Sequence, residues 1–375
     1  MKNQVDQLRI RHFKSIENLD IHPSRINVFI GEPNVGKSNI LEAIGLLGFA
    51  YGLEGINDDV LKRYVRYEEP SNLFYDDKTE TEFEIITNQV MAMGKLFLHQ
   101  GNPFIFSTFP YTPQFPDIYD AIKESNNSND CINLVSAALD NFSNKKIVAD
   151  FYPLVYSIPA SYSTNQNQFL QFRNNSPFKR YDFKKINDIS NKFPSFLIPP
   201  YGPNLFQIVK RDQDLSLEIK YIFESYGLKF RFDEKKSNFT IVKEKGLSDF
   251  TTPYSSMADT LQRLIFYFAA IDSNANSVLI LEEPEVHSFP PYTRNLAERI
   301  VNADQNQFFI ATHSPYMLEA LMEKANEEDL SIWLTYYENH ETKVKLIPHQ
   351  LLRNLQTFNY DIFFNLDQLL EEVSA

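Results

Sequence analysis

The sequence contains a single cysteine, Cys131, among its 375 residues. One thiol cannot form an intramolecular disulfide or a cysteine-based zinc site, so both of these stabilising devices are excluded. Long apolar runs are also missing: no segment approaches the ~20 apolar residues of a membrane span, and the N-terminus lacks the apolar core of a signal peptide. We therefore expect a cytoplasmic protein, which agrees with the scarcity of cysteine.

Positive charge is the second shortage. The 36 Lys and Arg residues are outnumbered by 49 Asp and Glu residues, which gives a net charge of −13. A chain this acidic does not attract nucleic acid over its whole surface, so DNA binding would require a local basic patch. Hydrophobic residues make up 43% of the chain and aromatic residues 14%, which is enough for a buried core and argues against intrinsic disorder.

Three segments differ in their pattern. Residues 1–98 contain strand-like runs at 8–13 and 25–30 and a helical pattern after the second run. Residues 99–250 are rich in Pro, Asn, Ser, Phe and Tyr without a heptad repeat, and we interpret them as an inserted, mainly helical domain ending in a β-hairpin. Residues 251–375 return to alternating helices and strands, so the sequence predicts an α/β fold interrupted by an insertion.

The run GEPNVGKS, from Gly31 to Ser38, has the P-loop spacing G-x-x-x-x-G-K-[ST]. It follows an apolar strand and opens a helix, a context that a chance glycine-rich turn does not supply. Backbone N–H groups of such a loop surround phosphates, and the N-terminus of the helix attracts their negative charge. Lys37 would contact the β- and γ-phosphates, and the Ser38 hydroxyl would bind Mg²⁺.

Two carboxylates, Glu282 and Glu283, end the apolar run VLIL. Ligands bind at the carboxyl ends of strands in open α/β sheets. We expect Glu282 to hold Mg²⁺ and Glu283 to orient the water that attacks the γ-phosphate. The alternative is an ordinary charged strand end, which the P-loop in the same chain makes less attractive.

His313 follows the next apolar run, in ATHSP, and would donate a hydrogen bond to the same phosphates. A lone histidine is more often structural, so its position after a strand carries this interpretation. In SSMADTLQR, Ser256 precedes Asp259 by three residues, a pattern typical of a helix N-cap. The N-terminus of this helix is either a cap alone or a contact to the ATP of a second subunit.

Taken in order, these motifs resemble ABC-type ATPases of the OLD/RecF/SMC-like branch. The resemblance spans roughly residues 1–98 and 250–347 and includes RIRHFKSIENLDI, INVFIGEPNVGKSNILEAIGLL, LEEPEVHSFP and ATHSPYMLEAL. LIPPYGPNL, inside the presumed insertion, also resembles a segment of OLD-type relatives. The resemblance implies a P-loop NTPase fold of ABC type, with a mixed β-sheet core flanked by helices. It also implies a homodimer or a higher homo-oligomer that holds ATP between two heads.

The resemblance also assigns roles to individual residues. Glu283 would be the catalytic base, His313 the switch histidine, Ser38 and Glu282 the metal ligands, and Ser256 the ligand in trans. Many ABC proteins have Asp at the position of Glu282 and Gly in the SSMAD segment, and Phe289 replaces a common histidine. No Q-loop glutamine can be assigned. The nucleotide ligands implied are Gly31, Asn34, Gly36, Lys37, Ser38 and Asn39.

Two functions fit this resemblance. The first is an ATPase switch of a prokaryotic anti-phage defence system that acts with a separate effector, such as a nuclease. The second is a RecF- or SMC-like ATPase of DNA repair or chromosome maintenance, although the lack of a coiled-coil arm disfavours the SMC role. A self-contained OLD nuclease is also disfavoured, because the stretch after His313 is shorter than the roughly 100 residues of a Toprim domain.

One segment combines basic and aromatic residues in the way that single-stranded DNA binding requires. A solvated loop is the alternative interpretation of the same pattern. The candidate DNA contacts are Lys179, Arg180, Lys184, Lys185 and Lys192.

Overall fold

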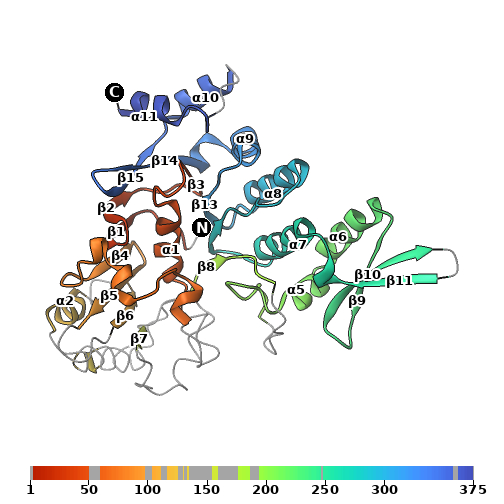
Figure 1. Cartoon of the computed structure of the whole chain (residues 1–375), viewed down its shortest axis with the longest axis horizontal. Coiled ribbons are helices and arrows are strands. Elements are labelled where there is room, and N and C mark those ends of the chain that lie inside the picture. Colours follow the sequence, from red (N-terminus) through yellow and green to blue (C-terminus); the bar gives the residue numbers. More distant parts are fainter. Residues whose placement is uncertain are drawn as a thin grey trace.

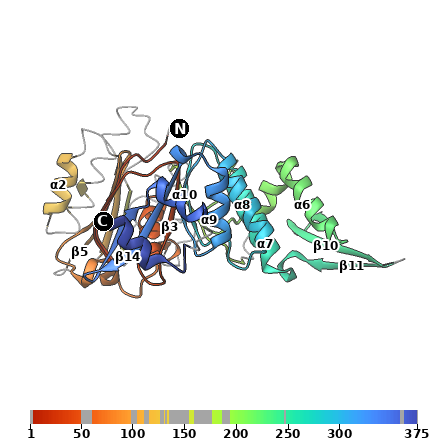
Figure 2. The ribbon, with the colours of Figure 1, turned by 90° about the horizontal axis from the view of Figure 1, so that it is seen from above.

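The computed structural model describes residues 3–49, 60–97, 104–110, 116–125, 130, 133–134, 154–158, 176–185, 194–245, 248–357 and 362–374. Within these residues the chain forms three β-sheets and the helices that pack on them. Two sheets make up the body of the molecule, and the third extends from one side (Figure 1). The view from above shows the same extension at one end of the long axis (Figure 2).

The first sheet is antiparallel and comes from the N-terminal part of the chain. Its strand order is β2-β1-β4-β5-β6-β7. The LRIRHF run forms the strand predicted at 8–13, in which alternation places Leu8 and Ile10 on the buried face. Phe13, the last residue of the strand, joins the same buried cluster. The strands are β1 (Leu8–Phe13), β2 (Ile16–Ile21), β4 (Phe83–Thr87), β5 (Val90–Leu96), β6 (Phe104–Pro110) and β7 (Leu154–Ile158).

The second sheet, which we call the core sheet, has the strand order β15-β14-β3-β13-β12-β8. All its pairs are parallel except β14 with β15. Its central strands are buried on both faces and are therefore continuous apolar runs, as the sequence predicts. The strands are β3 (Ile26–Ile30), β8 (Phe178–Tyr181), β12 (Val278–Glu282), β13 (Gln307–Ala311), β14 (Leu330–Glu338) and β15 (Glu341–Leu346).

Helix α1 (Lys37–Leu46) lies between the first sheet and the core sheet. Its residues Ile40, Leu41 and Ile44 belong to the same buried cluster as Ile10 of β1 and Ile280 of β12. A helix buried on two sides needs apolar residues around most of its circumference, which NILEAIGLL supplies. The N-terminus of α1 is thereby fixed at the carboxyl end of β3.

The opposite face of the core sheet is covered by helices α7 (Asp259–Asp272), α8 (Pro290–Asn302) and α9 (Pro315–Lys324). The core sheet is thus a mixed β-sheet flanked by helices on both faces, which confirms the predicted P-loop NTPase fold class. The C-terminal helices are α10 (His349–Thr357) and α11 (Leu366–Ser374), and Ile362 and Leu369 join the core cluster. The amphipathic C-terminal segment therefore packs on the body.

The third sheet has the strand order β11-β10-β9, all antiparallel. The predicted hairpin corresponds to β9 (Lys229–Asp233) and β10 (Asn238–Lys245), and β11 (Ser248–Pro253) adds a third strand. Helices α5 (Leu205–Arg211) and α6 (Gln213–Ser225) pack beside β9 and α7. Every residue of β11 is exposed, so this strand forms an open edge.

The interpretation of 99–250 as a mainly helical insertion needs correction. Among its described residues, β6 and β7 extend the first sheet, and β8 is the edge strand of the core sheet beside β12. Alongside these strands the described part has the helices α2 (Pro116–Glu124), α5 and α6. Composition suggested a separate unit, whereas the pairing of distant strands builds this segment into both sheets of the body.

Phe83 lies at the centre of an aromatic cluster in the first sheet, so a substitution at this residue tests the packing of that sheet. It is completely buried and its ring packs on the rings of Phe13, Phe74, Phe104 and Phe106. We expect Phe83→Ala to lower the free energy of unfolding by about 3–5 kcal/mol, because the cavity cannot collapse among rings from two strands, β1 and β6, and from Phe74. Phe250→Ala, at a ring that is 59% exposed, should change it by no more than ~0.5 kcal/mol. Denaturant titration measures both, and equal effects would contradict the assignment of this core.

Candidate nucleotide-binding site

The P-loop connects β3 to α1 and contains three residues with positive φ. The φ angles are 148° at Gly31, 64° at Asn34 and 98° at Gly36, and residues other than Gly and Asn rarely adopt such backbone conformations. A Cβ on Gly31 would lie 2.0 Å from the carbonyl oxygen of Thr335, and one on Gly36 would lie 2.0 Å from Thr342 Oγ1. Both glycines are therefore required by backbone conformation and by space.

The β14–β15 hairpin supports this loop from behind. The Thr342 hydroxyl donates a hydrogen bond to the Val35 carbonyl at 2.9 Å and lies 2.7 Å from Ser15 Oγ. Asn39, expected among the nucleotide ligands, donates its amide to Ser15 Oγ at 2.6 Å. Asn39 thus ties α1 to the β1–β2 turn, a structural role that sequence spacing does not reveal.

Lys37 lies across the loop that it follows. Its ammonium group donates to the carbonyl oxygens of Gly31 at 2.9 Å and Glu32 at 2.6 Å. Burial lowers the pKa of Lys37 to about 8, opposed by the nearby negative charges of Glu283 and Glu282. The lysine and the two carboxylates, far apart in the sequence, therefore share one electrostatic environment.

Glu283 and His313 follow the neighbouring strands β12 and β13. The Glu283 amide donates to the Ala311 carbonyl at 2.9 Å, which brings the two strand ends together. His313 Nε2 lies 3.6 Å from Glu283 Oε1, and both side chains are partly exposed. Burial lowers the pKa of His313, the charge of Lys37 lowers it further, and Glu283 opposes this. This environment therefore favours the neutral imidazole, in which one ring nitrogen carries a proton.

Glu282 is half-buried and lies between two positive charges. Arg180 Nη2 lies 2.6 Å from its Oε2, and Arg66 Nη2 lies 3.1 Å from its Oε1. Burial alone would raise the pKa of Glu282, but Arg180, a hydrogen bond with Ser38 and Arg66 together hold it below its usual value. The carboxylate is therefore ionised and firmly positioned.

The predicted metal ligands Ser38 and Glu282 meet directly, since their side chains hydrogen-bond. A hydroxyl and a carboxylate oxygen are donors that Mg²⁺ prefers, so the pair fits this ion. The part of the chain that the structure describes holds no group of three or more His, Cys, Asp or Glu side chains suited to a metal. Mg²⁺ that is bound by one or two side chains and by phosphate oxygens needs no such cage.

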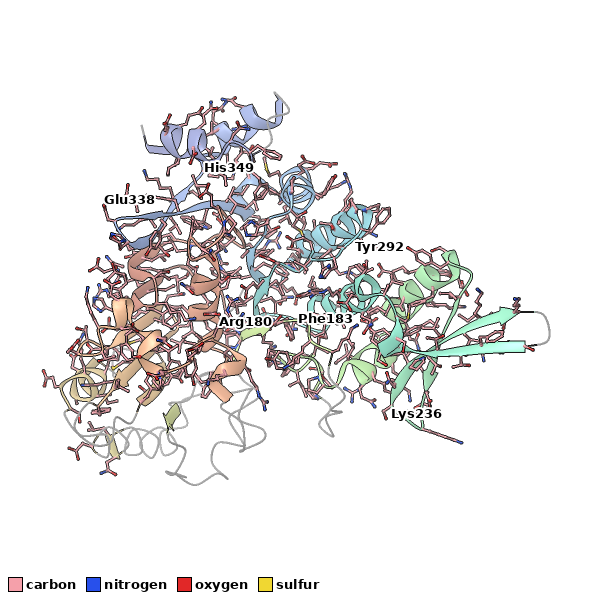
Figure 3. The ribbon with its side chains drawn as sticks, viewed as in Figure 1. Arg180, Phe183, Lys236, Tyr292, Glu338 and His349 are labelled. Atoms are coloured by element: carbon pink, nitrogen blue, oxygen red, sulfur yellow. The ribbon has the colours of Figure 1, made fainter. Side chains whose placement is uncertain are left out.

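A cavity of about 350 Å³ adjoins these carboxylates. Its wall includes three residues that the sequence did not assign to the nucleotide site: Arg66, Asp182 and Arg180, the last of which was expected to contact DNA instead. Arg180 and Asp182 arrive with β8, which pairs in parallel with β12 and places Tyr181 opposite Leu281. Figure 3 shows Arg180 near the middle of the molecule and Phe183 nearer to α7. No local motif distinguishes β8, so only the strand pairing identifies these residues.

The SSMAD segment departs from its predicted form. Ser256 lies in a short 3-10 turn, Tyr254–Ser256, and α7 begins only at Asp259 with Ala258 as its N-cap. Ser256 is therefore not the helix cap, and its side chain is exposed instead. Asp259 pairs with Lys185 at 2.6 Å, and this hydrogen bond lowers the pKa of Asp259.

The basic segment is largely not a surface patch. Lys179 is buried and donates to Asn274 Oδ1 at 2.6 Å and Ser277 Oγ at 3.0 Å, and Arg180 is buried against Glu282. These two residues were wrongly predicted to contact DNA, because β8 is an internal structural strand. Lys184 and Lys185 are exposed, and Lys192 lies outside the described residues.

None of the helices in the described part of the chain is long and apolar enough to cross a membrane.

Comparison with known proteins gives three kinds of similarity. Residues 133–319 match the AAA_21 family, described as "AAA domain, putative AbiEii toxin, Type IV TA system". This stretch includes Glu282, Glu283 and His313 but not the P-loop. The chain is also 23% identical over 372 residues to an "ATP/GTP phosphatase" of Helicobacter pylori, with 91% of each chain covered.

Two solved structures of SMC heads also align with most of the chain. One is an SMC head bound to the C-winged helix domain of ScpA, with 14% identity, a TM-score of 0.45, and 92% of this chain and 98% of that chain covered. The other is a Pyrococcus furiosus SMC head with an extended coiled coil, bound to the C-terminal domain of ScpA, with 13% identity, a TM-score of 0.44, and coverages of 95% and 99%. The P-loop and the strand order establish the fold independently of these scores.

The loop geometry predicts the effect of one added methyl group. We expect Gly36→Ala to abolish binding of a fluorescent ATP analogue, because its Cβ would overlap Thr342 Oγ1 and distort the loop. Gly227→Ala is the matched control: Gly227 also has positive φ, 69°, but nothing lies within 4 Å of the added Cβ. The control should lose about 1–2 kcal/mol of stability and keep nucleotide affinity. Retained affinity in Gly36→Ala would contradict the role of the loop.

The burial of Lys179 should make the free energy of unfolding depend on pH. Burial lowers the pKa of Lys179 to about 7 in the folded protein, well below the ordinary value of about 10.5 for a lysine in water. Between these values the unfolded chain binds more protons, so this residue makes the free energy of unfolding rise from about pH 7 to about pH 10. Lys179→Met should flatten this rise in denaturant titrations, relative to Lys184→Met at an exposed site. An identical rise in both variants would show that Lys179 is not the source.

Proposed function

We propose that this protein is an ATP-binding and ATP-hydrolysing switch of the ABC type. The observation that carries the proposal is the convergence of Lys37, Glu283 and His313 at one edge of the core sheet. These residues follow three parallel strands, β3, β12 and β13, whose carboxyl ends face the same way. The similarity to an AAA family and to an "ATP/GTP phosphatase" supports hydrolysis.

Each residue has a role that its position allows. Lys37 would move from the carbonyls of Gly31 and Glu32 to the β- and γ-phosphates, whose negative charge is the stronger attraction. Ser38 and Glu282 would hold Mg²⁺, which when bound neutralises charge on the phosphate oxygens. The P-loop amides would surround the remaining oxygens.

Hydrolysis requires an oriented water. Glu283 would accept a hydrogen bond from this water and direct its oxygen to the γ-phosphorus. The bond from the γ-phosphorus to the bridging oxygen then breaks, giving ADP and phosphate, and the proton of the water passes to Glu283. Neutral His313, 3.6 Å from Glu283, would donate a hydrogen bond to a γ-phosphate oxygen.

We further propose that two heads close on ATP. Phe289 and Tyr316, each 57% exposed, precede or open the helices that follow β12 and β13. Exposed aromatic side chains are enriched at protein interfaces, and these two lie on the segments that lead away from the catalytic strand ends. Exposed Ser256 would then contact the γ-phosphate held by the other head.

The biological setting that we propose is a prokaryotic defence system, in which the switch acts with a separate effector. The description of the matched family names a toxin of a type IV toxin–antitoxin system, and this similarity supports the proposed setting. A repair role through direct DNA contact has lost support at its main candidate segment, since Lys179 and Arg180 are buried in ion pairs and hydrogen bonds.

Glu283→Gln tests the proposed function. The amide keeps the size of the side chain but cannot accept the proton, so we expect ATP hydrolysis to fall by about 10²–10⁴-fold while ATP binding persists. Trapped ATP should hold two heads together, and light scattering after size-exclusion chromatography should then show a dimer that forms only with ATP.

Two variants serve as controls for this test. Glu328→Gln, at an exposed residue just before β14 and therefore at the opposite edge of the core sheet, should hydrolyse ATP like the parent. Lys37→Ala should neither bind ATP nor dimerise. Unchanged hydrolysis in Glu283→Gln would refute the catalytic assignment. A trapped but monomeric protein would refute the two-headed arrangement and leave hydrolysis intact.

A further inference from the structure

Both oxygens of the Glu282 carboxylate contact guanidinium groups. Arg180 occupies Oε2 at 2.6 Å and Arg66 occupies Oε1 at 3.1 Å. A divalent cation that binds Glu282 must share or displace one of these contacts, because two cations at one oxygen repel each other. In this structure, two arginine side chains therefore occupy both oxygen atoms that Glu282 would offer to a metal ion.

The two arginines differ in how firmly they are held. The Arg180 side chain is 5% exposed, and its other terminal nitrogen donates to the Tyr64 carbonyl. It belongs to β8, which is paired with β12 along its length. Arg180 is therefore a fixed partner that positions Glu282.

Arg66 is the exchangeable partner. Its side chain is 65% exposed, and it approaches Glu282 through Nη2 alone. A different nitrogen, Nε, donates to Oε1 of fully buried Glu42 at 2.6 Å. Arg66 can therefore release Glu282 while Glu42 retains it, so that displacement requires no unfolding of the segment around it.

From this geometry we propose that Arg66 is a positioning residue that closes Glu282 to divalent cations until a nucleotide is bound. The inference rests on the proposed ATP site and concerns the order in which its ligands bind. A triphosphate beside Lys37 adds negative charge and further oxygen ligands, and this combination outcompetes Arg66 for the metal position. A cation alone has only Ser38 and a neutralised carboxylate and binds weakly.

The test is Mn²⁺ binding to the full chain, followed by electron paramagnetic resonance of free Mn²⁺. Without nucleotide, the parent should bind Mn²⁺ weakly, and a non-hydrolysable ATP analogue should tighten binding. Arg66→Gln should tighten nucleotide-free Mn²⁺ binding by about two- to fivefold, a size that fits the loss of one partly exposed ion pair. A purely structural role for Arg66 would not produce this gain.

Two further variants locate the effect. Arg294→Gln removes another partly exposed arginine paired with a glutamate, Glu323, and should leave Mn²⁺ affinity unchanged. Adding Glu282→Gln to Arg66→Gln should remove the gain, because the freed ligand is then lost. A thermal melt verifies that each variant is folded.

The proposal is overturned if Arg66→Gln leaves nucleotide-free Mn²⁺ affinity unchanged, or if the gain survives Glu282→Gln. It is also overturned if the parent binds Mn²⁺ equally well with and without the analogue while binding the analogue itself. Failure of the proposed function is a separate result, namely a parent that binds no nucleotide, and it does not alter the nucleotide-free comparison.

Discussion

The ion pair between Arg180 and Glu282 is the interaction on which the site depends. A carboxylate placed at the end of a buried strand loses much of its hydration and needs a positive partner to remain ionised. The parallel pairing of β8 with β12 supplies that partner from a neighbouring strand. The ionised carboxylate that the proposed metal site needs is therefore stabilised by a strand that carries no recognisable motif.

A second constraint acts on the P-loop from β14 and β15, which lie beside β3 in the core sheet on the side away from β12 and β8. Thr335 and Thr342, on β14 and β15, leave no space for a side chain at Gly31 and Gly36. The loop is therefore shaped by a hairpin whose residues lie about three hundred positions later in the chain. Such rigid support is what keeps several backbone amides aimed at one point before any ligand arrives.

The sequence was sufficient to predict the P-loop, the carboxylate strand and the histidine strand, because each combines an apolar run with polar residues directly after it. It was insufficient for β8, whose four residues FKRY resemble a basic surface segment as much as an internal strand. Burial of Lys179 and Arg180 depends on Asn274, Ser277 and Glu282, which lie about a hundred residues away. Ser256 failed as a cap for a local reason, since a 3-10 turn moves the start of α7 to Asp259.

The site therefore combines groups of two kinds. Arg180 and Glu42 are buried, and Gly31 and Gly36 have no space for a side chain, so these residues have little freedom. Arg66, Glu283 and His313 are at least one third exposed. Exposed side chains change partners at small energetic cost, because water replaces the contact that is lost. Fixed groups define where the phosphates and metal would lie, and exposed groups are able to respond to them. This division suits a switch, in which ligand binding must alter the surface around the site without rebuilding the core.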